Sequence, residues 1–392
     1  MGQRPEHVLT LLQGSRALFP ALVDAMAQAR ESILFETYIF DFHGDSLIVA
    51  EALAQAAERG VQVRVVLDGV GTPQVPPRWV ARWREAGVQW RIYEPLGWVG
   101  LALPTRWRRL HRKLCVVDLS VAFCGGINLL DDHHDPHQLR RLEHPRLDFA
   151  VQVRGPLVGA IQATMLQLWW RVQLSRQLRH QQVSGALETL REPEAAPLPD
   201  TRGRYRLVLR DNVRHRRSIQ RSYLQAIGRA REEILIANAF FLPGGKLRRA
   251  LIRAAQRGVK VRLLLQGRYE YWLAYRASRQ VYGPLLAAGV DILEYTPSYL
   301  HAKVAVIDSR WMTVGSSNLD PLSLLLAREA NIVAQAPQVA VTLRQALVQA
   351  MDQGGRVVDL DGHRQRSWTQ RWLDWAAYAV TRLAIFLTAK RY

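Results

Sequence analysis

The sequence predicts an α/β protein made of two tandem domains, each a mixed β-sheet flanked by helices. Two observations lead to this fold class. The same order of short patterns occurs twice along the 392 residues, and in each copy apolar runs of strand length alternate with amphipathic stretches of helix length. The composition agrees, because 48% apolar residues can fill the large core that two domains require.

Four matched pairs of segments define the internal repeat. They are residues 30–34 with 231–235, 58–64 with 256–262, 86–88 with 288–290, and 111–118 with 301–308. We therefore expect a first domain at 1–176 and a second at 205–365, followed by a separate C-terminal segment at 366–392. Residues 177–204 between the domains are polar and contain three prolines, which is typical of a linker.

Each half is expected to follow the same course of elements. An amphipathic helix leads into an apolar strand, a second helix ends at a glycine, and a strand rich in Val or Leu follows. These elements are expected at 17–29, 33–40, 46–59 and 61–68 in the first half, and at 219–230, 234–241, 246–257 and 259–266 in the second. A further helix and strand flank each Ala-Gly-Val segment, and a helix is expected at 157–174 before the linker.

Each half also carries one copy of a His-x-Lys-x4-Asp pattern on its last predicted strand. The residues are His111, Lys113 and Asp118 in the first copy, and His301, Lys303 and Asp308 in the second. Residues two apart on a strand point to the same side, so each histidine shares a face with its lysine. A glycine-led turn follows each copy and is expected to bring Asn128 or Asn318 near the same spot, with Ser316 beside the second. These three side chains are the predicted substrate-binding residues.

This set of side chains suits displacement at a phosphodiester. One imidazole can attack phosphorus, while a second protonates the leaving alcohol and later deprotonates the incoming one. Two lysines and two asparagines can stabilise the phosphoryl oxygens, so we expect neither a cofactor nor a metal. A single copy would be equally compatible with a buried structural histidine. Two copies at equivalent places in a repeat favour a catalytic site.

These motifs resemble the HKD motifs of the phospholipase D superfamily, and the resemblance covers nearly the whole chain. Within the superfamily the sequence is most similar to bacterial cardiolipin synthases of the B type, the short form without N-terminal membrane spans. The supporting stretches are 125–132, 211–217, 237–244 and 315–321. The resemblance implies two phospholipase D-like domains with a pseudo-twofold active site between them. It also implies transfer of a phosphatidyl group between phosphatidylglycerol molecules through a phosphatidyl-histidine, with glycerol as product or acceptor.

The resemblance further implies individual roles for the motif residues. It makes His111 the nucleophile and His301 the general acid and base, although the reverse order stays open. Each histidine needs an orienting acid, for which Glu329 fits in the second half and Asp148 is the matching position in the first. The motif aspartates either take part directly in the chemistry or brace the site from behind.

The formal net charge of +19 favours a polyanionic partner, either nucleic acid or an anionic membrane surface, although a basic surface that only contacts water is the alternative. A nuclease or other phosphodiesterase acting on nucleic acid is therefore the rival function. An apolar loop at 96–103 and a Trp-rich segment at 368–392 favour the membrane and make nucleic acid an unlikely partner. The loop could instead be a core segment, and the Trp-rich helix could instead pack on the domain or on a partner. The apolar face expected for that helix contains Trp368, Trp372, Ala376, Ala379, Leu383 and Phe386.

Other features bear on location and on rival sites. Cys115 and Cys124 make no disulfide framework, and no apolar run is long enough to span a bilayer. These features fit a reduced, cytosolic setting, and the resemblance then implies a peripheral location on the cytoplasmic side of the inner membrane. The Asp- and His-rich run 131–137 matches no closed zinc pattern and is expected at the rim of the cleft. For Glu36, a bond to a buried arginine is favoured over a place lining the cleft.

Overall fold

The computed structural model describes residues 7–95, 108–135, 141–179, 203–211, 215, 217–268, 272–320 and 327–389. The chain divides into two compact units, Met1–Asp131 with Ala150–Leu207, and Asp132–Phe149 with Val208–Tyr392. The segment Asp132–Phe149, which the sequence assigned to the first domain, thus folds with the second. Most of the predicted linker and all of the loop at 96–103 lie outside the described residues.

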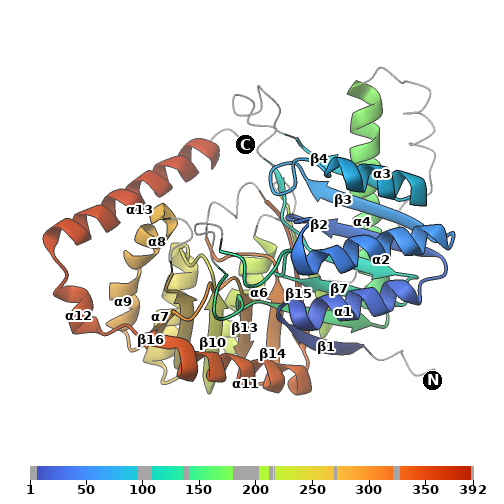
Figure 1. Cartoon of the computed structure of the whole chain (residues 1–392). Helices are drawn as coiled ribbons and strands as arrows, with labels where there is room; N and C mark the ends of the chain where they lie inside the picture. Colours follow the sequence, from blue (N-terminus) through green and yellow to red (C-terminus); the bar gives the residue numbers. More distant parts are fainter. Residues whose placement is uncertain are drawn as a thin grey trace, which may run out of the picture. The chain divides into compact units, whose positions relative to one another are not determined.

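The first unit is a mixed sheet covered by helices on both faces (Figure 1). Its strands lie in the order β1 (Val8–Gln13), β8 (Phe149–Arg154), β7 (Val121–Gly125), β6 (Leu114–Val117), β2 (Ser32–Thr37), β3 (Gln62–Asp68) and β4 (Gln89–Tyr93). The strands β2, β3 and β4 run parallel, whereas β6 pairs antiparallel with both β2 and β7. On one face lie α1 (Gly14–Ala27), α2 (Leu47–Glu58) and α3 (Pro77–Ala86), and on the other α4 (Leu157–Arg179).

Successive side chains of β3 pack alternately into the cores on the two faces of the sheet. Val65 and Leu67 belong to the core beneath α1, α2 and α3, whereas Val66 packs with Leu168 and Trp169 of α4. Such an apolar run without polar breaks is what a strand covered on both faces requires. The predicted helix at 157–174 is confirmed as part of α4.

The second unit repeats this order of strands. It comprises β16 (Gly355–Val357), β12 (Asp291–Tyr295), β11 (Lys260–Gln266), β10 (Glu233–Asn238), β13 (Lys303–Ile307), β14 (Trp311–Gly315) and β15 (Ala327–Gln335). The helices α6 (Ser218–Arg229), α7 (Gly245–Gln256) and α9 (Tyr282–Leu286) pack on one core, and α11 (Pro337–Gly354) packs against β10, β12, β13 and β14. The predicted α/β fold with mixed sheets is therefore confirmed.

Glycine ends the second helix of each half, as predicted. Gly60 follows α2 with φ +89°, and Gly258 follows α7 with φ +86°. These left-handed conformations carry no steric cost for glycine and close the last helical turn. The parallel strands β3 and β11 each begin two residues after this glycine. The same helix-ending signal therefore determines where the next strand starts in both halves.

The chain ends in two helices, α12 (Leu360–Arg364) and α13 (Trp368–Ala389), of which α13 packs along α8 (Trp272–Arg279). Among the described residues, no helix combines the length and apolar character needed to cross a bilayer. Neither cysteine forms a disulfide, and both are buried in the β6–β7 hairpin, where burial raises the pKa of the Cys115 thiol.

Candidate active site

The two motifs build the same local arrangement of histidine and lysine. His111 and Lys113 lie just before the central strand β6. In the second copy His301 lies just before β13, and Lys303 is the first residue of that strand. In each copy the lysine ammonium donates a hydrogen bond to the backbone carbonyl of the histidine, over 2.9 Å for Lys113. Both lysines are buried, so each unit holds a cation directly beside its histidine.

An aromatic residue completes the first copy. The ring of Tyr38 lies 5.0 Å from the ring of His111, centroid to centroid, and 5.3 Å from the ammonium of Lys113. Tyr38 follows β2, which pairs with the motif strand β6, so the sheet itself places the phenol beside the motif. The tyrosine limits the movement of His111 and shields the lysine from water.

The two motif asparagines share an unusual feature. Asn128 and Asn318 follow the motif hairpins and are both buried. Within the described part of the chain, the side-chain oxygen Oδ1 of each has no hydrogen-bond partner. A buried polar atom without a partner is costly, and it marks a place where a ligand or water completes the bonding. The same gap at the same position in both units supports a binding role for these side chains.

Asp148 holds the second-motif histidine. Its Oδ2 lies 2.6 Å from Nδ1 of His301, and the carboxylate is buried. Backbone bonds fix this pair, because the Leu147 amide donates to the Tyr299 carbonyl and the His301 amide donates to the Leu147 carbonyl. A carboxylate on Nδ1 fixes the tautomer and directs Nε2 towards the reaction.

This contact corrects one sequence-based expectation. The repeat placed Asp148 with the motif of its own half, whereas the structure places it on His301 of the other motif. The physical reason is the short parallel pairing of Leu147 with Leu300, which carries the first-half segment into the second unit. The same segment contributes Asp135, which accepts a hydrogen bond from the Tyr299 hydroxyl over 3.1 Å.

The Asp- and His-rich run is thus tied to the second unit where it is described. No group of three metal-ligating side chains is found among the residues that the structure describes. His133 contacts the Leu142 carbonyl through Nδ1, and Arg146 stacks its guanidinium 5.0 Å from the Tyr299 ring. These contacts hold the segment that leads to Asp148.

Glu329 and Ser316 form a bonded pair within the second unit. The Ser316 hydroxyl donates to Oε2 of Glu329 over 2.5 Å and accepts from the Ala330 amide over 3.1 Å. Both residues are fully buried. These two bonds show that Ser316 holds Glu329, and the predicted contact of Ser316 with substrate stays a prediction. Gly126 occupies the matching place in the first half, so the support is not repeated there.

Each motif aspartate holds a distant backbone segment by hydrogen bonds. Asp118 accepts hydrogen bonds from the amides of Arg30, Glu31 and Ser32 over 2.7–2.9 Å. Asp308 accepts the equivalent bonds from residues 231–233 over 2.9–3.0 Å. Each aspartate lies five residues beyond its lysine along a strand, which is a distance of about 16 Å. The structure therefore supports the bracing role of this pair over a direct part in the chemistry.

Arg210, which the sequence did not single out, is a buried cation of the second unit. It ends β9 (Tyr205–Arg210) and is only 2% exposed. Its guanidinium nitrogens have no hydrogen-bond partner among the described residues. Burial lowers the pKa of Arg210 to about 10, against the opposing charges of Glu329, Asp320 and Asp211. The only sequence signal was its place before the Asp211-Asn212 pair.

Glu36 has the structural role that the sequence favoured. It is 1% exposed and forms an ion pair of 2.9 Å with Arg112, the middle residue of the first motif. The second motif has Ala302 at that place, and its counterpart of Glu36, Asn238, instead accepts from the Leu319 amide. The repeat therefore conserves the histidine and lysine but varies the support behind them.

Comparison with known proteins identifies the family of the chain. Residues 22–137 and 223–351 match a protein family described as cardiolipin synthase, PLD-like domain. The chain is 36% identical over 377 residues to cardiolipin synthase B of Salmonella typhi, covering 94% of this chain and 86% of the relative. It is 35% identical over 374 residues to cardiolipin synthase B of Escherichia coli strain K12, covering 93% and 85%.

Solved structures show the fold alone. The crystal structure of phosphatidylserine synthase from Haemophilus influenzae Rd KW20 matches with a TM-score of 0.70 at 11% identity, covering 96% of this chain and 94% of the other. Polyphosphate kinase from Porphyromonas gingivalis matches with a TM-score of 0.55 at 13% identity, covering 88% of this chain and 50% of the other.

Proposed function

Since this chain belongs to the cardiolipin synthase family of phospholipase D-like proteins, we propose that it is a phosphatidyltransferase that makes cardiolipin from two molecules of phosphatidylglycerol. Relatives named cardiolipin synthase B match it over nearly its whole length and support the reaction class. The observation that carries the chemistry is the 2.6 Å bond between Asp148 and His301. The first motif repeats the histidine and lysine of the second, with the same bond from the lysine to the histidine carbonyl.

The proposed reaction has two steps. Nε2 of His111 attacks the phosphorus of phosphatidylglycerol, the phosphorus–oxygen bond to glycerol breaks, and His301 gives its proton to the departing glycerol oxygen. A hydroxyl of a second phosphatidylglycerol then loses its proton to His301 and attacks phosphorus, and the phosphorus–nitrogen bond breaks. Cardiolipin and one glycerol result, and glycerol acts as the acceptor in the reverse direction.

The remaining side chains stabilise charge and position. Lys113 and Lys303 offset the negative charge that develops on the phosphoryl oxygens, and Asn128 and Asn318 hydrogen bond to the same group. Glu329 is proposed as the second orienting acid, held by Ser316. The chain is proposed to act at the cytoplasmic side of the inner membrane, on lipid and not on nucleic acid.

The test uses the pure full-length chain with a chelator present. Phosphatidylglycerol vesicles should yield cardiolipin and glycerol in equal amounts, whereas single-stranded DNA should stay intact. His111→Ala and His301→Ala should each abolish turnover. If His111 is the nucleophile, quenching the His301→Ala enzyme in denaturant at alkaline pH, where the phosphorus–nitrogen bond survives, still traps a phosphatidyl group on protein, but quenching of His111→Ala does not. Cleavage of DNA without any lipid product would reverse the assignment.

A further inference from the structure

The last helix, α13, buries polar side chains and exposes large apolar ones, which is the reverse of an ordinary surface helix. The α13 residues that face the protein include Asp374, Ala377 and Thr381, all nearly inaccessible. Its large apolar residues are outside, with Trp368 77%, Trp372 58%, Trp375 55% and Leu383 57% exposed. A helix of a soluble domain normally buries its apolar stripe. In α13 the apolar stripe is exposed and does not contribute to the core.

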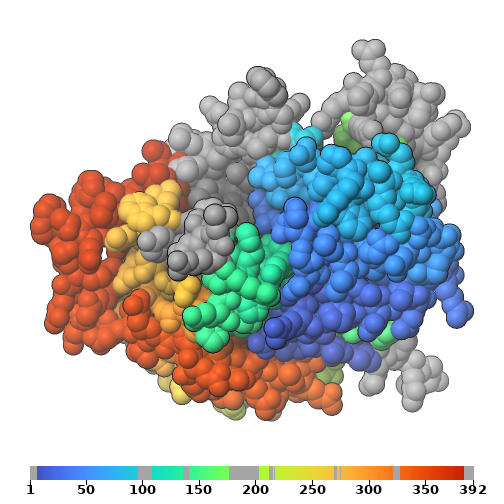
Figure 2. Space-filling model, viewed as in Figure 1, coloured from blue at the N-terminus to red at the C-terminus, as the bar shows by residue number. Residues whose placement is uncertain are grey.

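Helix geometry makes these exposed residues one surface. At 100° per residue, the three tryptophans and Leu383 fall within an arc of about 80°, opposite the buried residues, and the stripe is about 24 Å long. Figure 2 shows α13 as a ridge at the margin of the second unit. On α8, against which α13 packs, Trp272 and Leu273 are exposed as well. The structure adds Trp375, which the sequence had not placed on this face.

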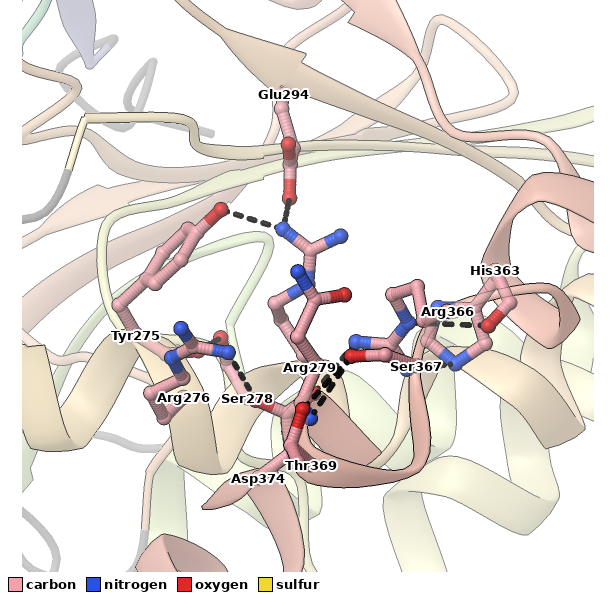
Figure 3. Close-up of polar contacts among 11 residues, drawn as sticks. Tyr275, Arg276, Ser278, Arg279, Glu294, His363, Arg366, Ser367, Thr369 and Asp374 are labelled. Atoms are coloured by element: carbon pink, nitrogen blue, oxygen red, sulfur yellow. Dashed lines mark hydrogen bonds and ion pairs between the residues drawn. The ribbon is translucent and has the colours of Figure 1, made fainter. Parts of the chain in front are cut away.

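A buried cluster of charges fixes the orientation of α13 (Figure 3). Asp374 is fully buried and pairs with Arg276 of α8 at 3.2 Å and with Arg366 at 2.5 Å. Arg366 also contacts His363 of α12, and burial together with the arginine charge lowers the pKa of that histidine to about 4. Turning the tryptophans inward would expose this aspartate and separate it from two arginines. Breaking such a buried pair is strongly unfavourable.

The charge of the exposed side is uniformly positive. Asp374 is the only acidic residue between Trp368 and Ala389, and it is turned inward and paired. Arg371 and Arg382 are exposed and border the apolar stripe by helical position. Tryptophans between water and an apolar phase, flanked by arginines, match the boundary between lipid headgroups and acyl chains. A second protein copy would bring the same positive charges against one another.

We propose that α13, together with the exposed start of α8, is the surface by which this protein lies on an anionic bilayer. Trp368, Trp372 and Trp375 insert at headgroup level, while Arg371 and Arg382 pair with lipid phosphates. The proposal deepens the proposed function by naming the surface that meets the lipid, and it rests on that function only for its effect on turnover.

Vesicle binding of the full-length chain tests the proposal. Wild type is compared with a variant carrying Trp368→Gln, Trp372→Gln and Trp375→Gln, on phosphatidylcholine vesicles with and without phosphatidylglycerol. The matched control carries Val8→Gln, Ile48→Gln and Val341→Gln, three apolar residues exposed elsewhere on the chain. The tryptophan variant should partition at least about tenfold more weakly, and the control should bind like wild type. Arg371→Gln with Arg382→Gln should remove most of the preference for phosphatidylglycerol.

Turnover separates this proposal from the proposed function. The tryptophan variant should lose activity on vesicles but keep it on short-chain phosphatidylglycerol dispersed as monomers. If wild type binds vesicles but makes no cardiolipin from either substrate, the proposed function fails and the docking surface stands. Unchanged vesicle binding by the tryptophan variant overturns the docking surface. If the same variant then separates a lipid-free oligomer into single chains, the stripe is an interface between copies.

Discussion

Asp148 shows what a sequence repeat can and cannot predict about a single residue. Its importance could be predicted, because it occupies the position that matches Glu329. Its partner could not, because His301 lies 153 residues further along the chain. A repeat suggests contacts within each copy, and only the pairing of Leu147 with Leu300 moves this carboxylate to the other motif. Asn128 and Asn318 were easier to predict, since a local turn after each motif hairpin places them.

The contact makes Asp148 a positioning residue with a measurable effect. In the Asp148→Asn variant, the neutral amide no longer stabilises a protonated His301 and no longer selects one tautomer. We expect kcat on phosphatidylglycerol to fall by about a hundredfold or more, with little change in KM, because the lost interaction serves proton transfer. Initial rates over a range of lipid concentrations in mixed micelles measure both constants.

Stability provides the control for this variant. The thermal midpoint of Asp148→Asn should stay within a few degrees of wild type, because the amide can still accept from the Phe149 amide. Asp352→Asn, on the exposed side of α11, should change neither constant. A rise in KM with kcat intact would show that Asp148 binds substrate and does not position His301.

At the scale of elements, local patterns predicted most of the fold. The first helices and strands of both halves begin and end within three residues of their expected limits, because apolar periodicity and the glycines at 60 and 258 are local signals. The role of the motif aspartates was harder to predict from the sequence. Nothing in the sequence near Asp118 indicates that it accepts hydrogen bonds from the turn before β2, 86 to 88 residues away.

This brace predicts a pH effect on stability in the first unit. Burial acts to raise the pKa of Asp118, but the amides of Ser32, Arg30 and Glu31 outweigh it and hold that pKa below its ordinary value of 3.8. A lowered carboxylate pKa stabilises the folded state above the ordinary value, and this contribution is lost as the pH falls through the lower folded value. Asp118→Asn should therefore lower the free energy of unfolding by about 2 kcal/mol at neutral pH.

Urea titrations at several pH values measure this difference. The gap between wild type and Asp118→Asn should be constant from neutral pH down to about pH 4, then narrow as the medium becomes more acidic. Asp24→Asn, an exposed aspartate on α1 of the same unit, should show no comparable gap. Turnover per folded molecule should be preserved in Asp118→Asn. Complete loss of turnover in a stable variant would restore a direct catalytic role to the motif aspartates.

At the scale of the whole molecule, the repeat and the family point to the same class of reaction. Two copies of the motif supply the two histidines that a double displacement needs, and the comparisons identify relatives named for cardiolipin synthesis. The net charge of +19 is the one whole-chain property that also suits nucleic acid. The net charge follows from the composition. The kind of polyanion that it attracts could not be predicted, because electrostatic attraction does not depend on the covalent structure of the polyanion.

The lipid assignment makes that charge a determinant of substrate capture. Attraction between a cationic protein and phosphatidylglycerol vesicles acts over about 10 Å at 0.1 M salt and about 3 Å at 1 M. Raising the salt concentration should therefore increase the apparent KM for vesicles severalfold while leaving kcat nearly unchanged, because the chemistry follows docking. Short-chain phosphatidylglycerol in monomeric form carries one charge per molecule, so its KM should respond much less. Rates on both substrates across a salt series decide the matter. If the KM for both substrates rises equally with salt, the charge acts at the reacting phosphate and not in vesicle binding. If the KM for vesicles does not change, the net charge plays no part in lipid capture.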